Sequence, residues 1–251
     1  MSRFLITGDK HGDFRLMPFT INKLGLQKED TLIILGDAGI NYYVKKKGEN
    51  SEHMYKDTNK TKMYKEFLQN LSCTFFCIQG NHEARAENIE GYKTKIWHGG
   101  KVSYQEDYPN ILFAIDGEVY NIKGKKTLVL GGAYSVDKHY RLQMGYAWFK
   151  DEQMSKESKN KVCELIKNDN KFDMILSHTC PLKYEPVEVF LPMVDQSTVD
   201  KTMEKFLQFV EDNVKYQNWY CGHYHVENDD ERLNGRDFGK LTFMYHSIIE
   251  L

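Results

Sequence analysis

Residues able to bind metals follow a short apolar run near the start of the chain. Residues 3–7 (RFLIT) lead directly into GDKHGD, which carries Asp9, His11 and Asp13. A polar turn would account for this cluster without any chemistry, because glycine and aspartate are common turn formers. The same arrangement occurs after four later apolar runs, however, and the repetition indicates a shared site.

Each of these later runs is short and rich in β-forming residues, as buried strands are. Polar residues of a restricted set follow every one of them. The runs and the residues after them are 31–35 (TLIIL) with Asp37, 74–78 (TFFCI) with Asn81 and His82, 172–176 (FDMIL) with His178, and 218–221 (NWYC) with His223 and His225.

Segments with helical periodicity separate several of the runs. Residues 197–213 place five apolar side chains on one face, with Ser197 and Asp200 as a predicted capping box, and residues 154–166 repeat the pattern more weakly. Alternating strands and helices favour βαβ units, in which ligands bind beyond the carboxyl ends of the strands. We therefore expect Asp9 and His11 to be one part of a site to which all five runs contribute.

The predicted ligand set offers oxygen and nitrogen and contains no thiolate. Such a set suits manganese, iron, zinc or similar ions better than it suits a structural zinc site of the cysteine type. Seven ligands exceed the need of one ion; with one bridging carboxylate they suit two ions about 3.5–4 Å apart, the spacing used for displacement at phosphorus. A structural hydrogen-bonding role explains any single member equally well. The members are Asp9, His11, Asp37, Asn81, His178, His223 and His225.

The five clusters, in this order, resemble the sequence blocks of the calcineurin-like metallophosphoesterases. The blocks here are GDKHG (8–12), GD (36–37), GNHE (80–83), SH (177–178) and GHYH (222–225). Two further stretches, WHGGKV (97–102) and GGAYSVDKHYR (131–141), resemble a bacterial and phage subgroup of that superfamily. The resemblance implies a single domain over residues 1–251 with an α/β fold, a four-layer αββα sandwich of two mixed β-sheets flanked by helices.

The resemblance also implies roles for individual residues. Asp9, His11 and His225 would bind one divalent ion, Asn81, His178 and His223 would bind the other, and Asp37 would bridge them. His82 would be the acid beside the phosphate, so that His82 and Asp37 are the implied catalytic residues. We expect manganese, with iron, zinc, nickel or magnesium as alternatives.

One departure from the superfamily concerns the residues after the bridging aspartate. Protein Ser/Thr phosphatases carry an Asp-Arg pair three and four positions later, where this chain has Ile40 and Asn41. This absence weakens an assignment as a protein phosphatase. Positive charge for the phosphate must then come from elsewhere, and Arg85, Arg141 and Lys10 are our candidates, although surface salt bridges would explain these residues as well.

The function that we predict is hydrolysis of a phosphate ester by a metal-bridging hydroxide, with a phosphomonoester as the leading substrate. The expected partner is a small phosphorylated molecule or phosphopeptide, with a nucleotide as a further candidate. A phosphodiesterase or nuclease on the same site is the alternative, and a non-catalytic interaction module on the same fold ranks last. The proline-containing stretch 180–195 is our candidate for a wall that shapes the substrate site.

Composition bears on the class of protein and its compartment. The chain has 251 residues, a formal charge of −2 and five cysteines at scattered spacings. These values argue against long polyanions as partners and against a disulfide framework, and with no apolar run long enough for a membrane span we expect a cytoplasmic protein. Residues 111–132 predict a three-stranded β-meander, residues 240–251 another strand at the edge of its sheet, and residues 44–62 a solvated loop that leads into a helix.

Overall fold

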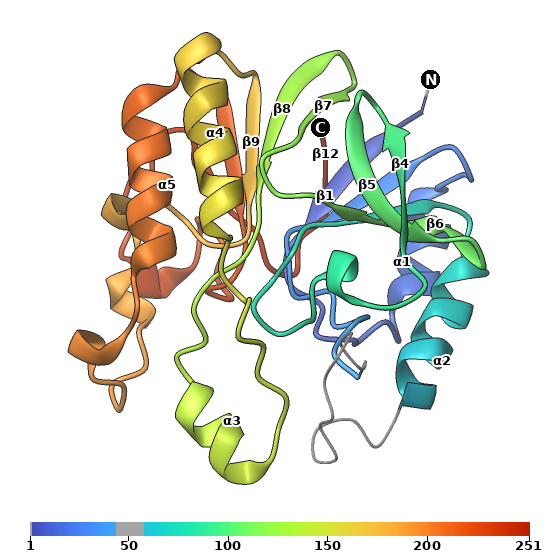
Figure 1. Cartoon of the computed structure of the whole chain (residues 1–251), viewed down its shortest axis with the longest axis horizontal. Helices are drawn as coiled ribbons and strands as arrows, with labels where there is room; N and C mark the ends of the chain where they lie inside the picture. Colours follow the sequence, from blue (N-terminus) through green and yellow to red (C-terminus); the bar gives the residue numbers. More distant parts are fainter. Residues whose placement is uncertain (1, 44–57) are drawn as a thin grey trace.

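The computed structural model describes residues 2–43 and 58–251, which form two β-sheets packed face to face (Figure 1). The larger sheet has seven strands in the order β12-β1-β2-β3-β6-β5-β4. The four central strands β1, β2, β3 and β6 pair in parallel, whereas β12, β5 and β4 are antiparallel to their neighbours. Its strands are β1 (Phe4–Thr7), β2 (Thr31–Ile34), β3 (Thr74–Cys77), β4 (Lys93–Trp97), β5 (Gly100–Gln105), β6 (Tyr108–Ala114) and β12 (Ile249–Glu250).

The smaller sheet has five strands in the order β11-β10-β9-β8-β7. Only the edge strand β7 is antiparallel to its neighbour, so this sheet is mixed as well. Its strands are β7 (Val119–Ile122), β8 (Lys125–Leu130), β9 (Met174–Ser177), β10 (Asn218–Cys221) and β11 (Leu241–Phe243).

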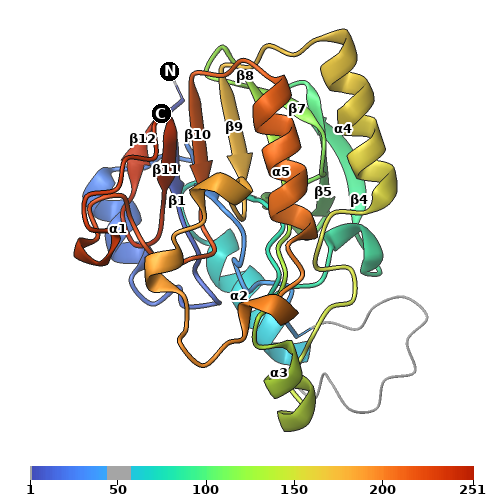
Figure 2. The same ribbon diagram turned by 90° about the vertical axis from the view of Figure 1, so that its left-hand side faces the viewer.

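Helices cover the outer face of each sheet, which gives four layers (Figure 1), and in Figure 2 the helices that cover the five-stranded sheet lie towards the viewer. α1 (Met17–Leu24) and α2 (Thr58–Gln69) pack on the seven-stranded sheet, and α4 (Lys156–Asn168) and α5 (Thr202–Asn213) pack on the five-stranded sheet. A third apolar cluster fills the space between the sheets, where Phe4, Ile33 and Phe76 face Met174 and Leu176. Strands buried on both faces explain the continuous apolar runs seen in the sequence.

Shorter elements connect these layers. α3 (Lys138–Met144) lies apart from both sheets, at the bottom of Figure 1. Single 3₁₀ turns occur at Ala86–Asn88, Leu182–Tyr184, Val187–Val189, Gln196–Thr198 and Glu231–Leu233. No helix in the described ranges is both long enough and apolar enough to cross a membrane.

The predicted fold class, two mixed sheets flanked by helices, is confirmed. The five apolar runs form β1, β2, β3, β9 and β10, each within two residues of its predicted limits. Helix α4 begins after Ser155, whose hydroxyl accepts the backbone N–H of Ser158. That the chain is one domain over residues 1–251 stays a prediction, and most of the predicted loop 44–62 lies outside the described residues.

The predicted meander is wrong at its first turn. β6 belongs to the seven-stranded sheet, and the chain crosses to the five-stranded sheet before β7. The carboxylate of Asp116 holds this crossing in place, because it accepts the backbone N–H of Gly131 at 2.8 Å. Residues 240–251 form two strands and not the single predicted one, with β11 at the edge of the five-stranded sheet and β12 at the edge of the seven-stranded sheet.

The predicted capping box of the last helix is wrong too. α5 begins at Thr202, not near residue 197, and Gln196–Thr198 form a separate 3₁₀ turn. Asp200 accepts the backbone N–H of Thr202 at 2.9 Å, which satisfies a donor of the first turn from a position nearer to the helix.

Burial of Lys65 on α2 predicts a pH-dependent stability. Burial lowers the pKa of Lys65 to about 7, and its Nζ donates to Oε1 of Gln105 at 2.7 Å. Between about pH 7 and pH 10 the unfolded chain therefore binds more protons at this residue than the folded chain, and stability rises with pH in this window. We expect Lys65→Met to be more stable than the wild type at and below pH 7, by on the order of 2 kcal/mol, with an advantage that fades towards pH 10.

Urea unfolding at a series of pH values measures this difference. Lys62→Met is the matched control, because Lys62 is exposed on the same helix. An advantage of Lys65→Met that does not change with pH would contradict the assignment of the effect to the buried ammonium.

Candidate metal centre

The predicted ligands meet where the parallel strands of the two sheets end. β1, β2 and β3 supply Asp9, His11, Asp37 and Asn81, and β9 and β10 supply His178, His223 and His225. Two hydrogen bonds join the sheets at this edge: the backbone N–H of His223 donates to Oδ2 of Asp9 at 2.9 Å, and Nδ1–H of His178 donates to the carbonyl of Leu35 at 2.8 Å. The structure therefore brings the residues of all five runs together, as their positions predict.

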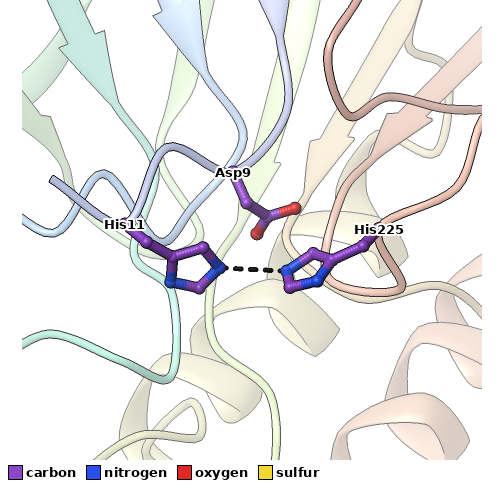
Figure 3. A group of neighbouring side chains, drawn as sticks. All are labelled: Asp9, His11 and His225. Atoms are coloured by element: carbon purple, nitrogen blue, oxygen red, sulfur yellow. Dashed lines mark hydrogen bonds between the residues drawn. The ribbon is translucent and has the colours of Figure 1, made fainter. Parts of the chain in front are cut away.

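The first group of ligand atoms consists of Asp9, His11 and His225 (Figure 3). Their ligand atoms lie within 4.8 Å of one another, and the Nε2 atoms of the two histidines are 2.9 Å apart. Oδ1 of Asp9 is buried and has no hydrogen-bond partner among the described residues. Burial raises the pKa of Asp9. A buried carboxylate oxygen without a donor, facing two imidazole nitrogens, is suited to a cation.

The second group is centred on His178. Because Nδ1–H of His178 donates to Leu35, Nε2 presents its lone pair to the site when the ring is neutral. Oδ1 of Asn81 lies 2.8 Å from this Nε2, and Oδ2 of Asp37 lies 3.6 Å from it. All three atoms are acceptors, so a proton or a metal ion is needed among them.

The pKa values of this group reflect the same excess of acceptors. Burial alone would lower the pKa of His178, but the Asp37 and Asp9 carboxylates outweigh it and raise that pKa to about 9. Burial alone would raise the pKa of Asp37, yet His178 and His82 hold it well below its usual range. The donor set thus fits divalent ions, which would replace the proton on His178.

His223 contributes differently. It belongs to none of the three-residue groups whose atoms converge within 4.8 Å among the described residues, and its ring centroid lies 5.0 Å from that of His178. Burial lowers its pKa well below the usual value, so the ring is neutral and able to act as a ligand. Its role as a metal ligand stays a prediction.

The backbone is strained at this edge. Seven residues other than glycine have a positive φ in the described chain, and four of them are predicted ligands: His11, Asp37, His223 and His225. Residues that have a Cβ rarely adopt a positive φ. This conformation costs about 1–3 kcal/mol per residue and is found mainly at functional sites. Packing of both sheets maintains turns that point these side chains towards one another.

His82 lies beside the ligands and is held by Asp37 and Arg141. Its backbone N–H donates to Oδ1 of Asp37 at 2.8 Å, and Nη2 of Arg141 donates to Nδ1 of its ring. A guanidinium has no acceptor, so Nδ1 must accept and the ring proton of neutral His82 is on Nε2. Nε of Arg141 donates in turn to Oδ2 of Asp137 at 2.7 Å. An Asp-Arg pair thus lies beside the histidine, contributed by α3 and the residue before it. The chain has Ile40 and Asn41 at the positions where protein Ser/Thr phosphatases carry their own Asp-Arg pair.

The three positively charged residues that we predict to bind the phosphate have different surroundings. Arg141 lines the cavity over the site. Arg85 is buried, with Nη1 2.5 Å from Oδ2 of Asp116 and Nε donating to the carbonyl of Asp151. Nζ of Lys10 donates to the carbonyl of Tyr245 at 3.1 Å, and burial lowers its pKa. Neither Arg85 nor Lys10 is among the described residues lining the cavity, so a substrate role for these two stays a prediction without support from their contacts.

A cavity of about 520 Å³ opens over the ligands. The predicted stretch 180–195 forms much of its far wall, through Glu185, Val189, Phe190, Leu191 and Val194. A smaller cavity of about 220 Å³ shares His11, His82 and Arg141 with the first and is also lined by Tyr42 and Tyr43. Asp13, by contrast, is paired with Arg15 at the surface and is not part of the site.

Comparison with protein families identifies the family of the chain. The model of the calcineurin-like phosphoesterase family matches residues 2–227. The chain belongs to this family. It is a member of a family of metal-dependent phosphoesterases that typically holds a dinuclear metal site, and the converging ligand groups agree with this. No curated protein matches the sequence.

Two solved structures are similar in fold at low sequence identity. One, 12% identical, has a TM-score of 0.50 over 99% of this chain and 94% of its own. The other, the protein TT1561 of Thermus thermophilus, is 11% identical, with a TM-score of 0.48 over 97% of this chain and 88% of its own. At 12% identity, the first similarity is evidence for the fold only.

Gly36 provides a test of the second ligand group. It has a φ of +88°, and a Cβ there would lie 2.1 Å from Nδ1 of His178. We expect Mn²⁺ to raise the melting temperature of the wild type, and we expect Gly36→Ala to displace the His178 ring and to abolish that rise. Thermal unfolding with and without Mn²⁺ measures this rise, which reports binding to the folded state.

Gly25→Ala is the matched control. Gly25 also has a positive φ, +59°, but a Cβ there would meet nothing within 4 Å. This variant should lose about 1–2 kcal/mol through backbone strain and keep the full effect of Mn²⁺. If both variants kept that effect, the close approach of Gly36 to His178 would not matter for metal binding.

Proposed function

We propose that this protein hydrolyses a small phosphate monoester at a dinuclear centre, with manganese as the metal. The observation that carries the proposal is the convergence of three groups of ligand atoms, one of which includes His82, next to a cavity lined by His11, Asp37, His82 and Arg141. When bound, divalent ions acidify water and neutralise charge on phosphoryl oxygens. Asp9, His11 and His225 would hold one ion, Asn81, His178 and His223 the other, and Asp37 both.

The remaining steps fall to residues of the chain. His82, with its proton on Nε2, would protonate the leaving oxygen, a contribution typically of 10²–10⁴-fold in rate. Arg141 would maintain this tautomer through Nδ1 and add positive charge near the phosphoryl group. Asp137 would orient Arg141 through its carboxylate.

Apolar residues on the far wall of the cavity favour a substrate whose ester group is apolar. Val189, Leu191 and Val194 line it, and the ring of Phe190 stacks on Tyr224 with centroids 6.2 Å apart. This apolar part of the lining would pack an aromatic or aliphatic group, while Glu185, Gln196 and Lys201 of the same cavity offer partners to polar substituents.

The smaller cavity favours a second candidate, a phosphodiesterase. A phosphodiester carries two substituents, and the hollow beside Tyr42 and Tyr43 could take the second one. Aromatic side chains at such a place would suit a nucleobase by stacking.

Two chromogenic substrates distinguish these candidates. We would compare hydrolysis of p-nitrophenyl phosphate with that of bis-p-nitrophenyl phosphate, with Mn²⁺ and with a chelator. Asp37→Asn is the control for contaminating activity. Faster Mn²⁺-dependent turnover of the monoester supports the proposal, preference for the diester supports the second candidate, and no cleavage of either refutes both.

The proton donated by His82 predicts a dependence on the leaving group. Phenolate needs protonation more than p-nitrophenolate does, because the nitro group stabilises the anion. We expect His82→Asn to lower kcat by about 10²-fold or more for phenyl phosphate and by much less for p-nitrophenyl phosphate.

His139→Asn is the control, because His139 is exposed on α3 and does not line the cavity. It should leave kcat unchanged for both esters. An equal loss for the two esters in His82→Asn would show that His82 acts on binding or on structure and not as an acid.

A further inference from the structure

A buried chain of hydrogen bonds leads from the predicted ligand Asn81 into the segment around α3. Nδ2 of Asn81 donates to Oγ of Ser135 at 2.9 Å, and Oγ of Ser135 donates to Oε2 of Glu152 at 2.6 Å. The same Oε2 accepts from Nε1 of Trp148 at 2.9 Å, and Oε1 accepts the backbone N–H of Ser135 at 3.2 Å. Asn81, Ser135 and Glu152 are each no more than 3% exposed.

The chain has a defined direction. Ionised Glu152 can only accept, and the indole and backbone N–H groups donate to its two carboxyl oxygens. The hydroxyl proton of Ser135 must therefore point to Glu152, and its lone pair faces Asn81. Only the NH₂ end of the Asn81 amide can meet that lone pair, which leaves Oδ1 directed at His178 and the metal centre.

This direction matters because the two ends of an asparagine amide have nearly the same shape. Reversal of the amide would turn its two N–H donors towards a cation and its oxygen away from the metal centre. The acceptor presented by Ser135 opposes this reversal, since a reversed Oδ1 would meet a lone pair there.

We propose that Ser135 and Glu152 are positioning residues that hold the Asn81 amide with its oxygen towards the metal centre. The inference rests on metal binding at the proposed site and not on any particular substrate. Residues beyond the ligands that orient them typically change metal affinity by 10–100-fold. The segment that supplies them also supplies Asp137 and Arg141, of which Arg141 contacts the neighbouring His82.

The test is Mn²⁺ binding by isothermal titration calorimetry, with the Asn81→Asp background as the discriminating step. We expect Ser135→Ala and Glu152→Gln to weaken one of two Mn²⁺ sites by about 10–100-fold. A carboxylate at position 81 has two equivalent oxygens and cannot be reversed. In the Asn81→Asp background, Ser135→Ala should therefore cost almost nothing, whereas a general loss of structure would weaken binding equally in both backgrounds.

Ser103→Ala is the matched control, because Ser103 is also buried and its hydroxyl has no partner among the described residues. It should bind Mn²⁺ as the wild type does. Melting temperatures without Mn²⁺ show whether each variant folds, and Ser135→Thr, which keeps the hydroxyl, should retain affinity if Ser135→Ala does not fold.

Three results would overturn the inference: no loss in Ser135→Ala and Glu152→Gln, an equal loss in both backgrounds, or no Mn²⁺ binding by the wild type. If the wild type binds two Mn²⁺ ions and hydrolyses neither chromogenic ester, the proposed function fails while this inference stands or falls on the affinities alone.

Discussion

An excess of buried acceptors at the junction of the two sheets is the constraint on which this structure depends. Oδ1 of Asp9 has no donor among the described residues, and Nε2 of His178 faces acceptors on Asn81 and Asp37. Burying such atoms is costly, so the folded site needs a proton or a metal ion among them. The strained turns at His11, Asp37, His223 and His225 are a second cost at the same place.

The packing of the two sheets explains how the fold tolerates the buried acceptors and the strained turns. The seven-stranded sheet contributes the carboxylates, His11 and Asn81, and the five-stranded sheet contributes His178, His223 and His225. Neither sheet has the complete set, so the site exists only while the sheets keep their relative position. The apolar layer between them, with Phe76 against Met174 and Leu176, provides that rigidity, because close-packed interiors resist sliding.

The sequence predicts well which side chains meet at this edge because each one follows a buried strand, so that local pattern and tertiary position coincide. Prediction from the sequence fails where contacts between residues far apart in the sequence determine the structure. Nothing near Asp116 in sequence shows that its carboxylate will accept from Gly131 and pair with Arg85, yet these contacts direct β6 and β7 into different sheets. Ser135 and Glu152 are likewise 54 and 71 positions away from Asn81, and their contact has no periodic pattern by which to find it. Arg141 could be found from the sequence only through the stretch that resembles a subgroup of the family.

Asn81 and His82 are consecutive residues with different chemical tasks, and the segment around α3 contacts both. Ser135 and Glu152 act on the amide of Asn81, whereas Asp137 and Arg141 act on the ring of His82. The two sets share a short piece of chain, but no side-chain hydrogen bond in the described structure joins one to the other. Orientation of a metal ligand and placement of a proton are therefore separable in this site. Tyr134 and Val136 of the same segment line the cavity beside them, so this segment also contributes to the wall that would face the substrate.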